Sequence, residues 1–415
     1  MDAPMSPQSA DYVTRVVHDP HAVPADAWDA LLRAHPAGAA SGPFMRHAYL
    51  AALHDSGCAT PATGWSPHWV TLWTRGDGAL AAAAPLYVKT HSFGEYVFDW
   101  AWAQAHHRHG VRYYPKGVVA VPFTPVAGPR LLARDADARA ALVHALIAHA
   151  RAQGLSSLHI LLGRDADWAA TDANPALGLL PRDTVQFHWH NRHPVRGTPF
   201  ADWEDLLASL SQDKRKKIRQ ERRKVAAAGV TFEARRGADI TAADWAFFTR
   251  CYTQTYVEHG NPPYLNEAFF RQVGQALPQQ WLMFIARDAQ GTRIAASLVA
   301  LSDDGASPAA AYGRYWGALA RVDCLHFEAC YYQPLAWCVA HGVQRFEGGA
   351  QGEHKMARAL LPTVVHSRHW LAHPAFADAV ADYLARERAA TSDYRTALQA
   401  HAPFRQAPSA PDCAR

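Results

Sequence analysis

The 415-residue sequence contains few charged residues, 19% in all, and its six cysteines form no C-x-x-C pair. The cysteine spacing excludes paired-cysteine motifs and favours reduced thiols in a cytoplasmic protein. No apolar run approaches the roughly 20 residues that a membrane-spanning helix needs. The N-terminal residues show no basic stretch leading into an apolar core, as a secretory signal would. We therefore expect a cytoplasmic protein with no transmembrane segment.

Several motifs that would fix a chemistry are also missing. The sequence contains neither of the glycine-rich nucleotide fingerprints, and it has no G-x-S-x-G nucleophile elbow. Histidines cluster at His106–His109 and at His188–His193, but neither spacing matches a known zinc motif. We expect no bound metal and no permanently bound cofactor.

The order of the expected elements repeats, which indicates an internal duplication. Hairpins are expected from Trp69–Trp73 with Ala79–Val88, and from Leu282–Arg287 with Arg293–Leu301. Aromatic residues, a helix and a further strand follow each hairpin. This order suits an α+β unit used twice. We place the first domain at residues 10–195 and the second at 196–390, and we expect the proline-containing tail, 391–415, to be disordered.

The densest charge lies within a helix expected over Asp202–Val225. Its segment Asp213–Lys224 holds eight basic and two acidic residues. Such a helix presents cations to an anionic group, for which phosphate is the commonest candidate, although a solvated basic helix is an equally good interpretation of the charge pattern.

The most specific segment is Phe346–Arg358. A strand is expected to run into Gly348, Gly349 and Gly352 and then into a helix. Glycines permit close backbone approach, and the helix start offers free N–H groups to an anion. The adjacent acid, imidazole and amine of Glu353, His354 and Lys355 concentrate acid and base capacity. The alternative interpretation is a tight turn with exposed polar residues.

A second helix, Leu325–His341, begins with another candidate group. Glu328 lies on the same face as Tyr331 and Tyr332, three and four residues further on. This carboxylate can act as a base or a substrate anchor, or it can serve only in capping and packing.

Four segments together resemble the FemAB-like bacterial proteins of peptidoglycan biosynthesis and the GNAT-family acyltransferases: residues 186–191, 214–222, 325–328 and 346–355. The resemblance extends from about Ser41 to Glu387. It implies two GNAT-like domains in tandem, with mixed sheets flanked by helices. It also implies transfer of an acyl or aminoacyl group to an amine, linked to cell-envelope precursor metabolism.

The resemblance leaves the donor open. A CoA-binding GNAT has a glycine-rich pyrophosphate loop, whereas Arg314–Cys324 contains Gly317 as its only glycine. Aminoacyl-tRNA, the donor of Fem-type enzymes, suits the basic helix better. Both acyl-CoA and aminoacyl-tRNA stay open as donors, with a small-molecule or envelope-precursor amine as acceptor.

We therefore predict an acyltransferase whose general base is Glu328 or His354. Substrate anchors are expected at Tyr312, Arg314, Glu347, Gln351, Glu353 and Lys355. Phosphate-binding cations are expected at Lys214, Arg215, Lys217 and Arg219. The alternative is a non-catalytic protein that uses its basic helix to bind RNA or an anionic envelope precursor.

Overall fold

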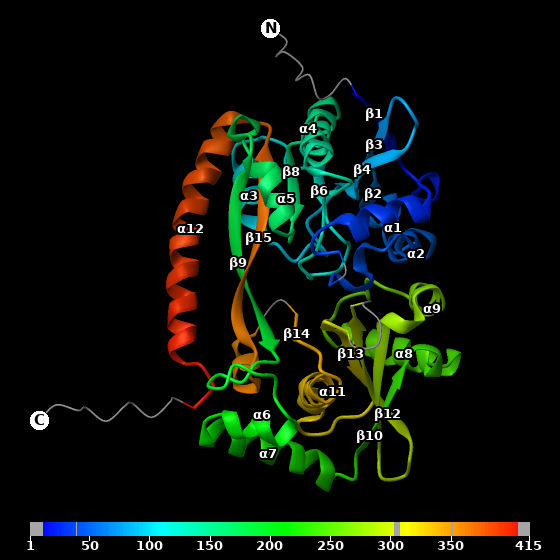
Figure 1. Ribbon diagram of the computed structural model, residues 1–415, viewed down its shortest axis with the longest axis vertical. Helices are drawn as coiled ribbons and strands as arrows, with labels where there is room; N and C mark the ends of the chain where they lie inside the picture. The colour runs from blue at the N-terminus through cyan, green and yellow to red at the C-terminus, as the bar shows by residue number, and fades with distance from the viewer. Residues whose placement is uncertain (1–10, 39, 303–307, 350–351, 406–415) are drawn as a thin grey trace, which may run out of the picture. The chain divides into compact units, whose positions relative to one another are not determined.

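The computed structural model describes residues 11–38, 40–302, 308–349 and 352–405. The chain forms two compact units (Figure 1). Unit 1 contains the chain up to Thr184 together with Tyr264–Leu277 and Val364–Asp393. Unit 2 contains Val185–Pro263, Pro278–Thr363 and the chain from Tyr394 onward. Both units are therefore discontinuous, whereas the sequence predicts two contiguous domains, 10–195 and 196–390.

A local contact explains why Tyr264–Leu277 belongs to unit 1. Phe269 in helix α9 (Glu267–Ala276) packs edge to face on Tyr49 of α2 (His47–Asp55), with ring centroids 5.3 Å apart. Asn266 also donates a 2.8 Å hydrogen bond to the Ser56 carbonyl. Sequence periodicity does not reveal such a contact between distant segments, so the contiguous ranges could not include it.

Unit 1 contains a four-stranded antiparallel sheet and a second set of strands. The first sheet has the order β1-β3-β4-β7, and the second set has the order β15-β8-β6-β5-β2. The strands are β1 (Tyr12–Val17), β2 (Trp65–Pro67), β3 (Trp69–Thr74), β4 (Leu80–Ala84), β5 (Leu86–Lys89), β6 (Lys116–Val119), β7 (Leu132–Ala133), β8 (Ser157–Leu161) and β15 (Leu361–Leu371). The remaining helices are α1 (Ala25–Ala34), α3 (Trp100–Arg108), α4 (Ala136–Ala152), α5 (Asp165–Asp172) and α12 (Pro374–Ala400).

The expected strand Ala79–Val88 is wrong as a single strand. Pro85 separates β4 from β5, and these two strands belong to different sheets. Proline lacks the N–H that a continuous ladder would use, which accounts for the break.

Unit 2 contains one mixed sheet with the order β10-β11-β12-β13-β14-β9. The pairing of β13 with β14 is parallel, and the neighbouring pairings are antiparallel. The strands are β9 (Leu180–His190), β10 (Thr231–Arg236), β11 (Trp281–Arg287), β12 (Arg293–Leu301), β13 (Ala310–Ala318) and β14 (Arg345–Glu347). The expected hairpin at 282–301 is confirmed by β11 and β12.

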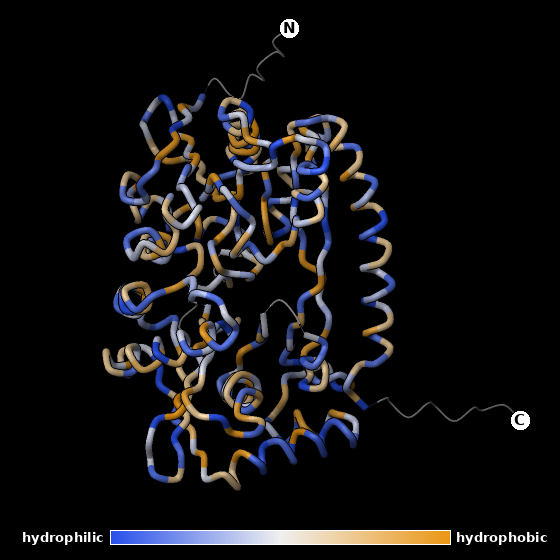
Figure 2. The backbone as a smooth tube through the Cα atoms, turned by 180° about the vertical axis from the view of Figure 1, so that it is seen from behind, coloured by the Kyte–Doolittle hydropathy of each residue, from blue (hydrophilic) through white to orange (hydrophobic). Residues whose placement is uncertain are grey.

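The helices of unit 2 pack around this sheet. They are α6 (Trp203–Ser209), α7 (Gln212–Ala227), α8 (Ala242–Glu258), α10 (Leu325–Phe327), the π-helix η8 (Glu328–Tyr332), α11 (Gln333–Ala340) and the 3-10 helix η9 (Glu353–Arg358). The helix expected over 202–225 is interrupted, because Leu210 adopts an extended conformation and buries its side chain in the core of unit 2. Charged residues occupy most of α7, which is largely blue in Figure 2.

The expectation of disorder from residue 391 is wrong as far as residue 400, because α12 continues to Ala400. Leu398 is buried in the core of unit 2, and the Tyr394 hydroxyl donates a 2.7 Å hydrogen bond to Glu353. Residues 406–415 of the expected tail lie outside the described residues.

Candidate functional site

The first feature of the site is the point at which β13 and β14 part. Their parallel pairing runs from Ala310 opposite Arg345 to Tyr312 opposite Glu347, while β13 continues to Ala318. Gly313 and Gly348 follow the last pair. A Cβ atom on Gly313 would lie 2.8 Å from the Phe346 ring, so glycine is needed where the two strands begin to diverge.

A cavity of about 150 Å³ lies at this divergence. Polar and aromatic side chains from β13 and from the helix that follows line it, together with Ser297 of β12. The main ones are Arg314, Tyr315, Trp316, His326, Cys330 and Tyr331. A cavity of this volume accepts a molecule about the size of benzene. The divergence therefore creates room for a small group directly beside polar side chains.

An imidazole and a phenol meet at the edge of this cavity. His354 Nε2 lies 3.3 Å from the Tyr331 hydroxyl. Burial and the nearby charges of Arg358 and Lys355 lower the pKa of His354, so its imidazole is neutral at pH 7. Burial also raises the pKa of the Tyr331 hydroxyl, which keeps its proton. A neutral imidazole next to a protonated phenol can pass a proton in either direction.

Cationic side chains lie close to His326, which lines the cavity. Burial, the neighbouring His354 and the charges of Arg358 and Lys355 lower the pKa of His326 to about 4. Burial lowers the pKa of Lys355 to about 8, and its Nζ donates a 3.0 Å hydrogen bond to the Gly349 carbonyl. Such surroundings favour an oxyanion over a second cation.

Of the other residues expected to anchor the substrate, only one is found to line the cavity among the described residues. Arg314 lines the cavity. Tyr312 and Glu347 are buried and both bind Arg345, at 3.3 Å and 2.9 Å. Glu353 accepts the hydrogen bond from Tyr394, and Gln351 lies outside the described residues.

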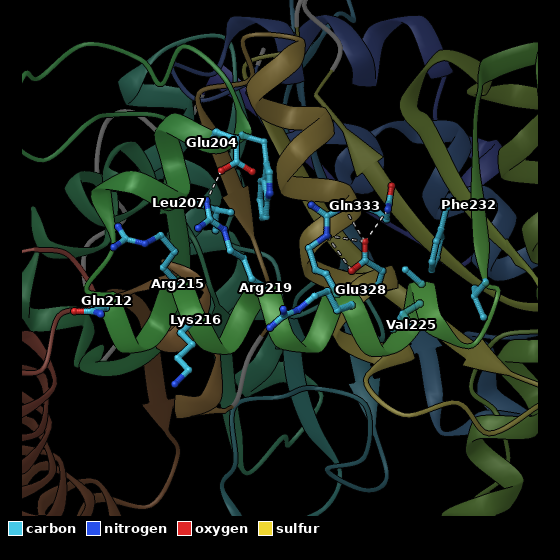
Figure 3. A pocket seen from close by; sticks show the side chains of 15 residues that line it. Glu204, Leu207, Gln212, Arg215, Lys216, Arg219, Val225, Phe232, Glu328 and Gln333 are labelled. Carbon is cyan, nitrogen blue, oxygen red and sulfur yellow. Dashed lines mark hydrogen bonds and ion pairs between the residues drawn. The ribbon is translucent and has the colours of Figure 1, made fainter.

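The second feature is a groove of about 790 Å³ along α7 (Figure 3). Trp203, Phe232, Glu328 and Gln333 contribute to its walls. The cations that line it come from α7: Arg215, Lys216, Arg219, Arg222 and Arg223. In Figure 3, Arg215 and Arg219 project toward Glu204 and Leu207, whereas Lys216 points to the other side of the helix. The expected cations Lys214 and Lys217 do not line the groove.

Carboxylates already neutralise two of these cations. Arg219 donates a 2.6 Å hydrogen bond to Glu204. Arg222 binds both oxygens of Glu328, with nitrogen to oxygen distances of 3.0 to 3.2 Å, and its guanidinium lies 5.0 Å from the Trp203 ring centroid. Among the described residues, Arg215, Lys216 and Arg223 have no carboxylate partner. These three positive charges remain available to an anion.

Glu328 is held on two sides. Its buried carboxylate accepts hydrogen bonds from Arg222 and, at 2.7 Å, from Gln333 Nε2. Arg222 and Gln333 therefore occupy the oxygens of this carboxylate. The Glu328 carboxylate therefore positions the Arg222 guanidinium in the groove.

A buried contact that the sequence did not suggest fixes α7 to the cavity elements. Glu221 accepts a 2.9 Å hydrogen bond from Arg358 and a short one from the Tyr332 hydroxyl. The Arg358 guanidinium in turn lies 3.6 Å from the Phe327 ring centroid. Glu221 thus couples α7 to both η8 and η9.

A family model described as FemAB-like, peptidoglycan biosynthesis/recognition, matches residues 19–406. The chain belongs to the FemAB-like family. No curated protein matches the sequence. The resemblance inferred from the four sequence segments is therefore confirmed at the level of the family.

Solved structures are similar to this chain in fold. FemX aligns with a TM-score of 0.51 at 12% identity, over 86% of this chain and 97% of FemX. The L-PGS protein of Bacillus licheniformis gives a TM-score of 0.48 at 10% identity, over 81% of this chain and 96% of L-PGS. A tandem GNAT protein from the clavulanic acid biosynthesis pathway gives 0.44 at 13% identity, over 88% of this chain and 99% of its own. The expected fold class, two GNAT-like α+β domains in tandem, is confirmed.

Two further observations concern the described residues alone. None of their helices is both long enough and apolar enough to cross a membrane. They contain no group of three or more His, Cys, Asp and Glu side chains arranged as a metal site.

Proposed function

We propose that unit 2 transfers an acyl or aminoacyl group to an amine. The observation that carries this proposal is the pairing of His354 with Tyr331 at the edge of the cavity where β13 and β14 part. The cavity holds the acyl group, and the positive surroundings stabilise the oxyanion that forms when the amine attacks the carbonyl carbon. Membership of the FemAB-like family supports an acceptor among cell-envelope precursors.

The proton movements balance within this pair. The attacking amine forms a new C–N bond and gives its proton to His354, either directly or through one water molecule. When the tetrahedral intermediate collapses, the bond from carbon to the leaving oxygen or sulfur breaks, and the Tyr331 hydroxyl protonates the leaving atom. His354 then returns its proton to Tyr331 across the 3.3 Å contact. The products are an amide and the free alcohol or thiol of the donor.

We propose that the α7 groove holds the phosphates of the donor. Arg215 and Arg223 line the groove and have no carboxylate partner among the described residues, and Trp203 offers a flat apolar surface next to Arg222. Both acyl-CoA and aminoacyl-tRNA carry phosphates that fit this chemistry. Glu328 serves in this proposal as a positioning residue for Arg222, and His354 is the base.

The test is the rate of amide formation by wild-type protein and by His354→Ala and Tyr331→Phe, with a panel of acyl-CoA and aminoacyl-tRNA donors. Loss of a general base typically costs about 10²-fold to 10⁴-fold in kcat. We expect a decrease in this range for His354→Ala. His259→Ala is the matched control, because His259 is an exposed histidine at the end of α8, also in unit 2.

A wild-type rate in His354→Ala, measured on a donor that the wild type uses, would contradict the assigned base. Donor binding without product across the whole panel would instead support a binding protein, the alternative that the basic helix leaves open.

A further inference from the structure

The segment His91–Trp100 of unit 1 has an inverted distribution of side chains. Its polar residues Ser92, Glu95 and Asp99 are buried. Its large aromatic residues are exposed, with exposed fractions of 55% for Phe93, 48% for Phe98 and 43% for Trp100. Burying carboxylates and exposing aromatic rings is the reverse of what stabilises a folded chain. We call His91–Trp100 the aromatic loop.

Buried ion pairs hold the inner side of the aromatic loop. Lys116 Nζ donates 2.8 Å hydrogen bonds to Ser92 Oγ and Glu95 Oε2, and it forms a shorter ion pair with Asp99. Lys89 Nζ donates a 2.9 Å hydrogen bond to the Phe93 carbonyl. These contacts fix the backbone so that the aromatic side chains face outward.

The outer side is also ordered. The Phe93 and Trp100 rings lie in contact, with centroids 5.2 Å apart. The Phe98 carbonyl accepts a 2.8 Å hydrogen bond from Arg182, and Glu387 grips the same guanidinium with both carboxylate oxygens at 2.8 Å. The exposed rings therefore sit on a fixed platform.

The exposed charged side chains within residues 91–112 have one sign. Within residues 91–112, all of which the structure describes, the only carboxylates are the buried ones of Glu95 and Asp99. The exposed side chains of the same stretch include Arg108 and Arg112, neither of which has a carboxylate partner among the described residues. His107 follows Trp100 by seven residues in α3 and so faces the same side of the helix.

We infer that the aromatic loop and α3, together with Arg108 and Arg112 at and beyond its end, dock on the surface of an anionic lipid bilayer. Aromatic side chains prefer the interface between lipid headgroups and acyl chains, and nearby arginines bind lipid phosphates. The absence of exposed carboxylates between residues 91 and 112 gives the complementary charge for this surface. This docking is independent of the proposed transfer reaction, which takes place in unit 2.

Co-sedimentation of the full chain with vesicles tests this inference. One set of vesicles is phosphatidylcholine alone, and in the other about a third of the lipid is anionic phosphatidylglycerol. We expect the wild type to bind the anionic vesicles. We expect the affinity of the triple variant Phe93→Ser/Phe98→Ser/Trp100→Ser for these vesicles to be at least about tenfold lower. Arg108→Gln/Arg112→Gln should weaken binding to the anionic vesicles and leave the low binding to phosphatidylcholine unchanged.

Val257→Ser/Leu319→Ser is the matched control, because these residues are 60% and 40% exposed in unit 2. It should bind vesicles as the wild type does. Unchanged circular dichroism and thermal melting of each variant show that binding is lost without unfolding. The inference is overturned if the wild type binds neither vesicle, if the triple variant binds as the wild type does, or if the aromatic loop binds soluble glycan chains or RNA in preference to vesicles.

Discussion

The α7 groove makes a quantitative prediction about phosphate binding. Arg215 and Arg223 line the groove without a carboxylate partner, whereas Lys214 and Lys217 lie on the same helix outside its lining. Arg215→Gln/Arg223→Gln and Lys214→Gln/Lys217→Gln therefore remove the same net charge from one helix. Only the first pair should remove contacts to a donor's phosphates.

The magnitude follows from counterion release. For a single-stranded polyphosphate, each neutralised phosphate contributes about 0.7 to the slope of log affinity against log salt concentration. Removing two contacts should lower that slope by about 1.4. The assay is fluorescence anisotropy with labelled tRNA and, separately, competition by CoA, over about a fourfold range of salt concentration. Equal losses in the two double variants would refute the role of the groove, since they would reflect net charge alone.

Further predictions concern stability and rate. Glu221→Gln should lower the free energy of unfolding in urea by about 3 kcal/mol, because it leaves the buried Arg358 guanidinium without its carboxylate; an unchanged midpoint would contradict this. Gly313→Ala should cost about 1–3 kcal/mol, since its Cβ would lie 2.8 Å from the Phe346 ring; a stable variant with unchanged melting would contradict it. Burial lowers the folded-state pKa of Lys89 to about 7. Between about pH 7 and pH 10 the unfolded chain therefore binds more protons than the folded chain, and the free energy of unfolding of the wild type should rise with pH relative to Lys89→Met. A constant difference across that range in chemical denaturation would show that Lys89 is charged in the folded protein. Because the pKa of His354 lies below its ordinary value, kcat should stay constant from neutral to mildly acidic pH and should fall only at lower pH, where His354 becomes protonated. A fall in kcat that begins above neutral pH would point to another base.

Local periodicity was enough to predict several elements of the fold. The hairpin at 282–301, the helix near α4 and the strand near β8 all have clear patterns, and the structure contains them. Pro85 also marks a break, because proline interrupts a ladder of hydrogen bonds, whereas the apolar residues around it predict a single strand. The packing of α9 on α2 depends on a contact between residues more than two hundred positions apart, and no local pattern carries it.

The helical phase of α7 decides which cations reach the groove. At about 100° per residue, Arg215 and Arg219 lie about 60° and 100° to one side of the buried Ile218, whereas Lys214 and Lys217 lie about 40° and 100° to the other side. The phase thus separates the two pairs, and it also places Arg222 and Arg223 on the groove side. The sequence does not indicate Arg222 and Arg223, because the buried face of α7 includes the charged Glu221 and is therefore not recognisable as an apolar stripe.

The pairing of His354 with Tyr331 was only partly accessible from sequence. The concentration of acid and base groups around His354 indicates a functional residue, whereas the sequence marks Tyr331 only as a neighbour of Glu328 on one helix face. The two side chains meet because η8 and η9 both pack beside β14, and the sequence does not specify that geometry.

The most direct test of the proposed reaction is mass spectrometry of amine acceptors after incubation with the purified chain and mixed acyl-CoA and aminoacyl-tRNA donors. The account predicts an acceptor whose mass rises by one acyl or aminoacyl group with the wild type and with His259→Ala, and which is unmodified with His354→Ala. An acceptor modified equally by wild type and His354→Ala, or left unmodified by the wild type with every donor, would contradict it.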